Sequence, residues 1–304
     1  MEILRQDGIR IAGVCACVPK NAVVNDAKVA QATGIITRRI AAEGTTVVDL
    51  CVKAAERVMS DAAAKPEEFG AILCVSFTQR DRMPAAAVQA QARLGFPKGI
   101  VAFDVSLACS GWGYGLYLAG LLARETGKKV LLLDGDVQSA FTGNDEATAP
   151  LLADGGTATV VESGRGEWMF GFAADGEKGG ALRLSHGETI KMDGFGVFKF
   201  VATDVVSCIK EFVLHCSPSA FTFVPHQPNA YMVRQLAKSV GIDEDRTAIS
   251  CDEIGNLSSA SVPATIAWKG VRGRVLFAGF GGGLSVSVGL VDLDDGCALS
   301  TLEI

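Results

Sequence analysis

Short apolar runs alternate with helical patterns through the first half of this 304-residue chain. The runs have the length of buried strands, and the segments between them repeat apolar residues every three or four positions, as amphipathic helices do. This alternation predicts an α/β fold with a mostly parallel sheet that helices cover on both faces. The expected strands are 9–18, 71–77, 100–105, 128–133 and 157–161, and the expected helices are 49–64, 85–94 with Pro84 in its first turn, and the segment after Cys109.

The second half repeats the order of the first: a strand, a residue with reactive chemistry, a helix, and an apolar strand behind glycines. This likeness predicts an internal duplication, with one half at residues 1–163 and the other at 164–304. Two segments, 134–150 and 164–196, lack a long periodic pattern and are expected to be loops. The expected elements of the second half are helices 198–214 and 231–240 and strands 221–224, 275–280 and 284–290.

Composition limits the classes of function. The net charge of −6 and the sequence pI near 5.2 argue against nucleic acid as the main partner. No run of about 18 uncharged apolar residues is present, and the first eleven residues lack the apolar stretch of a signal peptide, so we expect no membrane association. Nine cysteines without a CxxC pair indicate reduced thiols and a cytoplasmic protein rather than a disulfide framework.

Cys109 is the candidate nucleophile. It follows the apolar run 100–105 and precedes a segment with bulky residues at helical spacing, so we expect it at the N-terminus of a helix. Unpaired backbone N–H groups and the positive end of the helix dipole favour the thiolate, which is the attacking form. The position therefore predicts a thiol that is reactive at neutral pH.

His226 is the best placed of the three histidines to assist Cys109. It follows the apolar run 221–224, and the carboxyl ends of parallel strands are where side chains meet ligands. His186 lies in the glycine-rich connector and His215 near a helix end, and we expect both to be solvated. His215, Cys216 and His226 lack the paired spacing of a zinc site, so no metal is expected.

Asn256 and the glycines at 281–283 are further candidates. Asn256 stands in a loop of small residues, where it can supply a turn or a cap, or donate a hydrogen bond from its side chain to a developing oxyanion or enolate. Glycines at 281–283 allow a tight turn and also a close approach of backbone N–H groups to a ligand. The glycines that follow Cys109 lack the third glycine of a dinucleotide fingerprint, so we expect no nicotinamide site.

Four segments together resemble β-ketoacyl-acyl-carrier-protein synthase III, in order and in spacing. They are 104–111 (DVSLACSG), 224–229 (VPHQPN), 255–263 (GNLSSASVP) and 280–283 (FGGG). The resemblance extends over nearly the whole chain. It implies a thiolase fold, in which two duplicated α/β halves form five layers (αβαβα), and a homodimer.

The resemblance also implies a mechanism without a permanently bound cofactor, in which acyl-CoA or acyl-carrier protein is the substrate. Cys109 would take an acyl group from a thioester, with the oxyanion held by the N–H groups of Cys109 and Gly283. His226 and Asn256 would then stabilise the enolate formed by decarboxylation of a malonyl thioester. Met83 matches the position at which members send a large side chain into the acyl pocket of the partner subunit.

The departures from the family concern the entrance. Lys28 and Ala32 stand where members that use coenzyme A have a tryptophan and an arginine, and Asp145 and Glu146 stand where a basic residue is expected. The connector between Gly179 and Gly194 is shorter than in typical members. Tyr231 replaces a basic residue used in carrier docking, and the remaining candidates for that patch are Lys199, Arg234 and Lys238.

Three functions are compatible with these residues. The first is a condensing enzyme in specialised metabolism, which the altered coenzyme A site favours. The second keeps the acyl-cysteine but transfers the acyl group to a hydroxyl or amine, with His226 as general base. The third is a non-catalytic partner subunit of an active homologue, against which the joint presence of Cys109, His226 and Asn256 argues.

Overall fold

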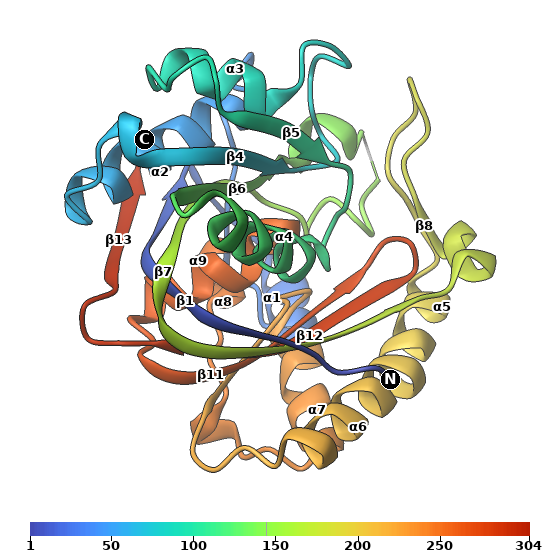
Figure 1. Ribbon diagram of the computed structural model, residues 1–304. Helices are drawn as coiled ribbons and strands as arrows, with labels where there is room; N and C mark the ends of the chain where they lie inside the picture. Colours follow the sequence, from blue (N-terminus) through green and yellow to red (C-terminus); the bar gives the residue numbers. More distant parts are fainter. Residues whose placement is uncertain (144) are drawn as a thin grey trace.

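A nine-stranded sheet forms one continuous hydrogen-bonded path through the computed structural model, which describes residues 1–143 and 145–304 (Figure 1). Its main path is β10-β11-β12-β7-β6-β4-β5, with β1 paired to β7 and β13 paired to β1. The strands are β1 (Leu4–Val18), β4 (Phe69–Val75), β5 (Val101–Val105), β6 (Lys129–Val137), β7 (Asp154–Ala174), β10 (Thr222–Pro225), β11 (Gly273–Gly281), β12 (Ser285–Leu293) and β13 (Ala298–Glu303). Two small antiparallel sheets pair β2 (Ala22–Val24) with β3 (Thr37–Arg39), and β8 (Leu182–Arg183) with β9 (Lys191–Met192).

The long strand β7 lies in the middle of this path and joins its two sides. Its first part pairs with β6 from Asp154 to Val161, and its last part pairs with β12 from Met169 to Ala174. The expectation of a loop from residue 164 is therefore wrong for its first part. Irregular pairing with β1 at Ile9 accommodates Ser163 and Gly166 within the strand. The strand was not predicted here because the segment is rich in glycine. The predicted boundary between residues 163 and 164 falls inside β7.

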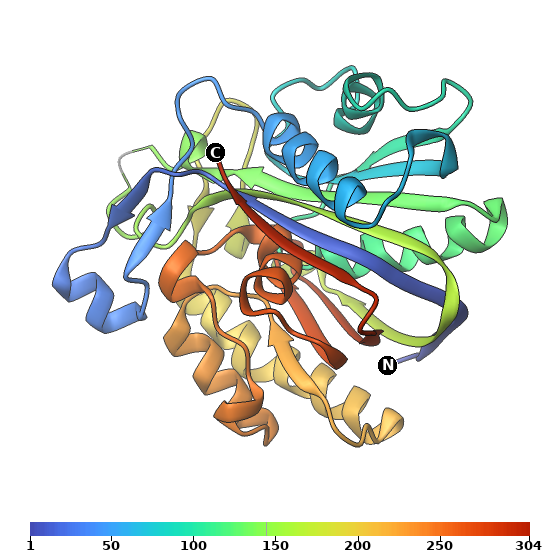
Figure 2. The ribbon, with the colours of Figure 1, turned by 90° about the vertical axis from the view of Figure 1, so that its left-hand side faces the viewer.

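Helices lie outside and between the two parts of the sheet, which gives the five layers expected (Figures 1 and 2). On one outer side are α2 (Val47–Asp61) and α3 (Ala86–Arg93), and between the strand layers are α4 (Gly111–Thr126) and α9 (Ser261–Lys269). On the other outer side α5 (Gly194–Phe200) continues through a π-helical turn at Val201–Val205 into α6 (Val206–Cys216). Helix α7 (Ala230–Val240) lies beside α6. The shorter helices α1 (Ala27–Thr33) and α8 (Cys251–Ile254) complete this part of the structure.

Three apolar clusters hold these layers together. The largest surrounds α4 and α9, and in it Trp112 of α4 meets Phe277 of β11 edge to face, with ring centroids 4.9 Å apart. The second lies under α2 and α3, and the third lies under α6 and α7. Each helix layer therefore buries its apolar face against strands, which is the arrangement that the helical spacing predicts.

Several predicted element ends are wrong for identifiable reasons. The loop predicted at 134–150 begins four residues later than predicted, because β6 continues to Val137. The added part of the strand contains two buried carboxylates, Asp134 and Asp136. Pro84 precedes α3 rather than standing in its first turn. The first amides of α3 are instead satisfied by Asp104 of β5, which accepts from Ala86 and Ala87 at 2.7 and 2.8 Å. The last strand, β13, was not predicted.

The close packing of α4 against β11 and β12 depends on Gly113. A Cβ atom there would lie 2.4 Å from Ser287 Oγ and 2.8 Å from the Phe277 ring. In an open helix the change from glycine to alanine would stabilise by about 1 kcal/mol. We expect Gly113→Ala to lower the free energy of unfolding by about 1–3 kcal/mol, because the overpacking outweighs that gain. Urea unfolding measures this, and Gly99→Ala, where nothing lies within 4 Å of the added carbon, is the control. Equal stability of the two variants would contradict the packing argument.

Candidate active site

Cys109 lies between β5 and α4, immediately before the first turn of the helix. Its side chain is buried, and its Sγ lies 3.7 Å from the Oγ of Ser258. The glycine segment after β11 packs on the other side, where a Cβ on Gly281 would lie 3.1 Å from Sγ. Gly281 has φ +155°, a backbone conformation that favours glycine, and the approach of these N–H groups to a ligand stays a prediction.

His226 comes directly after β10, as the sequence predicts. Its backbone N–H donates to the carbonyl of Ala278 on β11 at 2.7 Å, which fixes the residue at the end of the parallel pair. The imidazole is buried and stands edge to face against Phe280, with ring centroids 5.3 Å apart. Among the described residues the buried Nδ1 has no hydrogen-bond partner.

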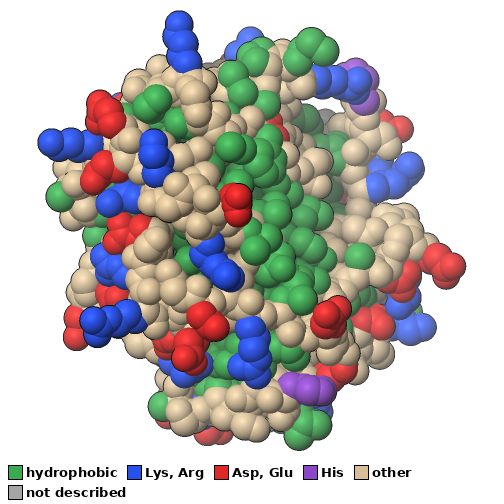
Figure 3. Space-filling model, in the orientation of Figure 1, with side chains coloured by type: hydrophobic (Ala, Val, Ile, Leu, Met, Phe, Trp, Pro, Cys, Tyr) green, Lys and Arg blue, Asp and Glu red, His purple; other side chains and the backbone are tan. Residues whose placement is uncertain are grey.

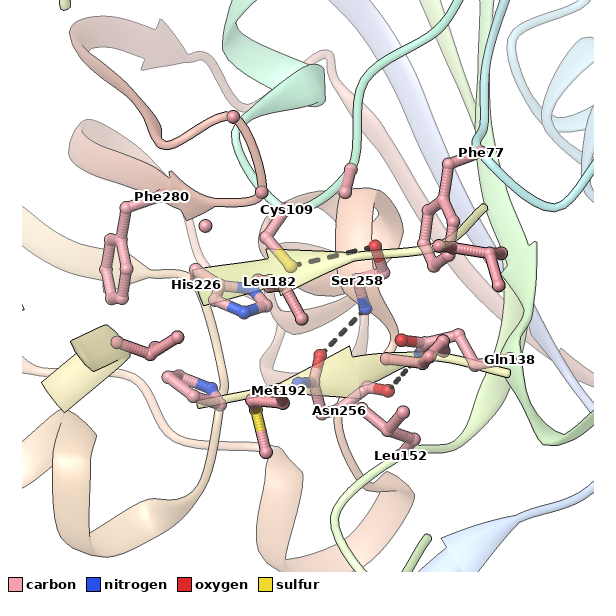
Figure 4. Close-up of a pocket in the computed structure, with 18 of the residues that line it drawn as sticks. Phe77, Cys109, Gln138, Leu152, Leu182, Met192, His226, Asn256, Ser258 and Phe280 are labelled. Carbon is pink, nitrogen blue, oxygen red and sulfur yellow. Dashed lines mark hydrogen bonds between the residues drawn. The ribbon is translucent and has the colours of Figure 1, made fainter. Parts of the chain in front are cut away.

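Asn256 is held on both its side chain and its backbone. The side-chain oxygen accepts the N–H of Ser258 at 2.9 Å, which leaves the NH2 group as the free end (Figure 4). Gln138 donates from Nε2 to the carbonyls of Asn256 and Ala153, both at 2.7 Å. Asn256 can therefore donate a hydrogen bond into the site but has little freedom to accept one.

One cavity of about 350 Å³ brings these residues together. Cys109, His226 and Asn256 all line it, together with the glycine loop (Figure 4). Most of the remaining wall is apolar, and includes Phe77, Leu152, Leu182, Ile190, Met192 and Phe280. An apolar cavity with a few converging polar groups is typical of a small-molecule site.

Burial dominates the electrostatics of Cys109. Loss of solvent raises the pKa of its thiol to about 12, although the Ser258 hydroxyl and the backbone N–H groups of Cys109 and Gly282 each lower it. The negative charge of Asp136 raises it further. The expectation of a thiolate at neutral pH is therefore wrong for the resting site, because desolvation outweighs the amides at the helix terminus. Attack by Cys109 requires a proton acceptor.

Burial acts on His226 in the opposite direction and lowers the pKa of its imidazole to about 3. The neutral ring carries one N–H donor and one acceptor nitrogen. At physiological pH His226 is therefore suited to hydrogen bonding with a substrate oxygen rather than to carrying a positive charge.

Other predicted residues lie away from the cavity. Met83 is 84% exposed and does not line the cavity of its own chain. Lys199 on α5 and Lys238 on α7 are exposed. Arg234 is paired with Glu244 at 2.7 Å, which reduces its contribution to a basic patch. For Gly283 a role in the oxyanion hole stays a prediction, since the amide beside the sulfur is that of Gly282.

Four of the residues that depart from the family line a second, wider opening. Lys28 and Ala32 of α1 face Asp145 and Glu146 across a space of about 1070 Å³. Asp26 and Arg38 also line it, so the wall carries charges of both signs. These four departures thus belong to one place in the structure, whereas Tyr231 and the short connector do not line it.

Sequence reasoning missed Ser258, Gln138 and Asp136. Ser258 lies in the quoted segment 255–263, but nothing in the sequence distinguishes it from Ser259 and Ser261. Its positive φ of +53°, which brings it against Cys109, appears only in the structure. Gln138 and Asp136 fell in a segment expected to be a loop. No three His, Cys, Asp or Glu side chains gather as metal ligands within residues 1–143 and 145–304.

Comparison with known proteins agrees with this site. Residues 103–176 match the family model for 3-oxoacyl-[acyl-carrier-protein] synthase III, and residues 220–293 match the model for its C-terminal part. The β-ketoacyl-[acyl-carrier-protein] synthase III of Desulfitobacterium hafniense is 32% identical over 300 residues, which are 88% of this chain and 89% of that protein. The chain belongs to the β-ketoacyl-acyl-carrier-protein synthase III family. It is therefore an enzyme of the condensing, transferase class.

Solved structures of the synthase III family have the same thiolase fold. The 3-oxoacyl-(acyl-carrier protein) synthase of Burkholderia xenovorans superposes with a TM-score of 0.94 at 29% identity, over 100% of this chain and 99% of that one. The priming β-ketosynthase of the R1128 polyketide pathway gives a TM-score of 0.87 at 26% identity, over 97% and 99% of the two chains. Among the described residues, none of the helices is long and apolar enough to cross a membrane.

The neutral state of His226 can be tested directly. Because burial lowers its pKa to about 3, we expect its imidazole to remain uncharged down to pH 5. NMR of protein with labelled histidine follows the ring carbon shifts from pH 8 to pH 5, and His226→Asn identifies the signal. A titration of that signal with a midpoint above pH 5 would contradict the assigned environment.

Proposed function

We propose that this enzyme catalyses a β-ketoacyl synthase III-type condensation in two stages. Cys109 first takes an acyl group from a thioester, and a malonyl thioester then undergoes decarboxylative Claisen condensation with the acyl-cysteine. The observation that carries the proposal is the convergence of Cys109, His226 and Asn256 on one apolar cavity.

In the first stage the thioester carbonyl lies against the end of α4. The oxyanion is held by the backbone N–H of Cys109 and by a second amide from the glycine loop. The position of the Gly282 amide beside the sulfur favours Gly282 over Gly283 for this second donor. A positioned donor of this kind is worth about 3 kcal/mol of transition-state stabilisation.

In the second stage the malonyl thioester carbonyl receives hydrogen bonds from His226 and Asn256. The neutral imidazole and the free NH2 group of Asn256 are both donors, so they stabilise the enolate that forms as carbon dioxide leaves. The enolate carbon then attacks the acyl-cysteine. The apolar wall excludes water, which would otherwise protonate the enolate or hydrolyse the thioester.

The acyl donor is an acyl-CoA or an acyl-carrier protein, and the altered entrance favours the carrier. The aromatic and basic residues of the coenzyme A site are replaced, and two carboxylates at the second opening repel the phosphates of coenzyme A. Lys199 and Lys238 are exposed for an acidic carrier. Similarity to a priming ketosynthase of a polyketide pathway supports a place in specialised metabolism.

The enzyme acts as a homodimer in this proposal. Strand β5 lies at the edge of the sheet and pairs with β4 alone among the described strands. Beside it the exposed side of α4 carries apolar residues, and Figure 3 shows a band of hydrophobic side chains across that face. We call this surface the α4 face; its residues are Tyr117, Leu118, Leu121 and Leu122. A second copy would cover both features, and the exposed Met83 would then reach the partner's acyl pocket.

Variants of the site residues are expected to affect the two stages differently. We expect Cys109→Ala to abolish acylation, because no nucleophile remains. We expect Asn256→Ala to load acyl groups almost normally but to decarboxylate malonyl thioester about 100-fold more slowly. Intact mass after incubation with acyl-CoA and acyl-carrier thioesters measures loading, and release of labelled carbon dioxide measures decarboxylation.

Two outcomes of that experiment would indicate a different function. Loaded enzyme that releases no labelled carbon dioxide and yields only an ester or amide identifies a transferase to hydroxyl or amine acceptors. Absence of an adduct on Cys109 with every donor identifies a non-catalytic subunit. Equal loss of both stages in Asn256→Ala would contradict the role given to Asn256.

The dimer is tested on the α4 face. Leu121 is 40% exposed, and a carboxylate at this position would have to be desolvated in the dimer. We expect Leu121→Glu to raise the dimer dissociation constant about 100-fold or more. Analytical ultracentrifugation measures it, and Leu214→Glu on α6, where the native side chain is 77% exposed, is the control. A wild-type protein that sediments as a monomer would refute the dimer.

A further inference from the structure

Two buried serine hydroxyls connect the start of the nucleophile's helix to the glycine loop, and the proposed mechanism does not use them. Ser110 follows Cys109 at the start of α4, and Ser285 begins β12. Their side-chain oxygens lie 2.7 Å apart, and both residues are buried. Ser285 Oγ in turn donates to the carbonyl of Gly282 at 2.8 Å. A continuous hydrogen-bonded connection therefore runs from Ser110 to the glycine loop.

The direction of these hydrogen bonds follows from the number of protons. A serine hydroxyl carries one proton, and a carbonyl oxygen can only accept. Because the proton of Ser285 is directed to Gly282, the bond between the two serines uses the proton of Ser110. Each hydroxyl therefore has one defined role: Ser110 donates to Ser285, and Ser285 donates to the loop.

Ser110 stands at a position where a serine commonly caps a helix. In a cap the hydroxyl accepts a hydrogen bond from a backbone N–H of the first helical turn. The side chain of Ser110 makes no such bond, although the residue directly precedes Gly111, the first residue of α4. Its hydroxyl contacts Ser285 instead, so it connects the helix end to another strand rather than to the helix itself.

Strand β12 holds Ser110 at a second point. Ser287, two residues after Ser285, donates from its Oγ to the backbone carbonyl of Ser110 at 2.8 Å. Strands β11 and β12 are joined by a tight turn at residues 282–284, which belongs to the glycine loop. The serines of β12 therefore fix the residue after the nucleophile on both its hydroxyl and its carbonyl, and Ser285 also fixes the turn.

The two donors of the proposed oxyanion hole come from these two segments. One is the N–H of Cys109, and the other is an amide of the glycine loop. Gly281 packs directly against the nucleophile, because a Cβ on it would lie 2.9 Å from Cys109 Cβ. Such a hole is effective only when its donors are fixed before the charge develops. The hydrogen bond to the Gly282 carbonyl restrains the loop, because a peptide group is planar and moves as a unit.

We propose that Ser110 and Ser285 position the glycine loop for the oxyanion that forms when Cys109 is acylated. Neither serine belongs to the described residues that line the cavity, and both act through Gly282. They are therefore positioning residues rather than catalytic ones. The inference rests on the proposed function of Cys109 as the acylated nucleophile.

The step that depends on this position is the loading of Cys109. Its Sγ forms a bond to the thioester carbon while one electron pair of the carbonyl moves to the oxygen, where the two amides hold the charge. When the carbonyl forms again, the donor sulfur leaves with the pair of the broken C–S bond. That sulfur ends with the proton that Cys109 gives up, so the enzyme returns to its starting charge.

A probe without a carbonyl separates the oxyanion hole from the thiol. In the reaction with methyl methanethiosulfonate, Cys109 Sγ forms a disulfide bond to the S-methyl sulfur. Methanesulfinate leaves with the pair of the broken S–S bond, and the thiol proton passes to the buffer. No oxyanion forms on a carbonyl carbon, so this rate reports only the access to Cys109 and its nucleophilicity.

We expect Ser285→Ala to be acylated at least about tenfold more slowly than wild type at saturating thioester, because the loop is no longer held. The half-saturating thioester concentration and the thiosulfonate rate should each stay within about twofold of wild type. Ser285→Thr keeps the hydroxyl and should load at nearly the wild-type rate. Rapid-quench intact mass measures loading, and peptide mass mapping follows Cys109 in the probe reaction, with Cys109→Ala as background.

The connection between the serines predicts a hierarchy among the variants. In Ser110→Ala the hydroxyl of Ser285 can still donate to Gly282, so loading should slow less than in Ser285→Ala. The double variant should be no slower than Ser285→Ala, because Ser110 acts through Ser285.

Ser250→Ala is the matched control. The hydroxyls of Ser250 and Thr265 form another buried pair, 2.8 Å apart, and neither residue lines the cavity. Loss of this hydroxyl should leave loading within about twofold of wild type, although it removes a comparable buried hydrogen bond. Urea unfolding of each variant establishes that folded proteins are compared.

Three results would overturn the inference. The first is unchanged loading in Ser285→Ala. The second is an equal slowing of loading and of the thiosulfonate reaction, which would indicate a general disturbance of the thiol. The third is equal slowing in Ser250→Ala. If Ser285→Ala fails to fold, Ser110→Ala decides: loading at least about threefold slower with an unchanged thiosulfonate rate supports the inference, and unchanged loading refutes it.

The inference and the proposed function fail in different ways. A wild-type protein that takes no acyl group from any acyl-CoA or acyl-carrier thioester would refute the proposed function, and the inference with it. Normal loading of the wild type, without a specific slowing in Ser285→Ala, would refute the inference alone.

Discussion

The desolvation of the Cys109 sulfur is the constraint on which the site depends. The sulfur lies between the end of α4 and Gly281, where no further side-chain carbon fits. This closeness supplies backbone amides to the reacting centre, and it also removes the water that would stabilise a thiolate. The polar groups that remain at the sulfur are therefore neutral: His226 and Asn256 line the same cavity, and the hydroxyl of Ser258 lies 3.7 Å from Sγ.

The fold brings these groups together from distant parts of the chain. Cys109 follows a strand of the first half, and His226 and Asn256 follow elements of the second half. The layer of α4 and α9 lies between the two parts of the sheet, so that both sets of strand ends meet beside it. Gln138 links the halves directly, since it starts from the end of β6 and donates to the carbonyl of Asn256.

Much of this could be predicted from the sequence, and the omissions have physical causes. Alternating apolar runs gave the strands and helices, and the quoted motifs gave the three residues that line the cavity. Element ends set by distant partners could not be predicted, as at α3, where Asp104 of another strand satisfies the first amides. The predicted thiolate at Cys109 is wrong because the sequence indicates the helix terminus but not the burial of the thiol. The degree of burial depends on the whole fold.

Strand β7 makes the two halves one folding unit. Cutting the chain inside β7, near residue 163, would leave β6 and β12 each with its own part of β7, but it would divide between two fragments the length of β7 that pairs with β1. Residues Leu4–Asp7 of β1 would then lose their β7 partners and present an open edge of unpaired backbone groups. Strand β13 would also lose β1, the strand with which it pairs, so each half depends on the other for part of its sheet.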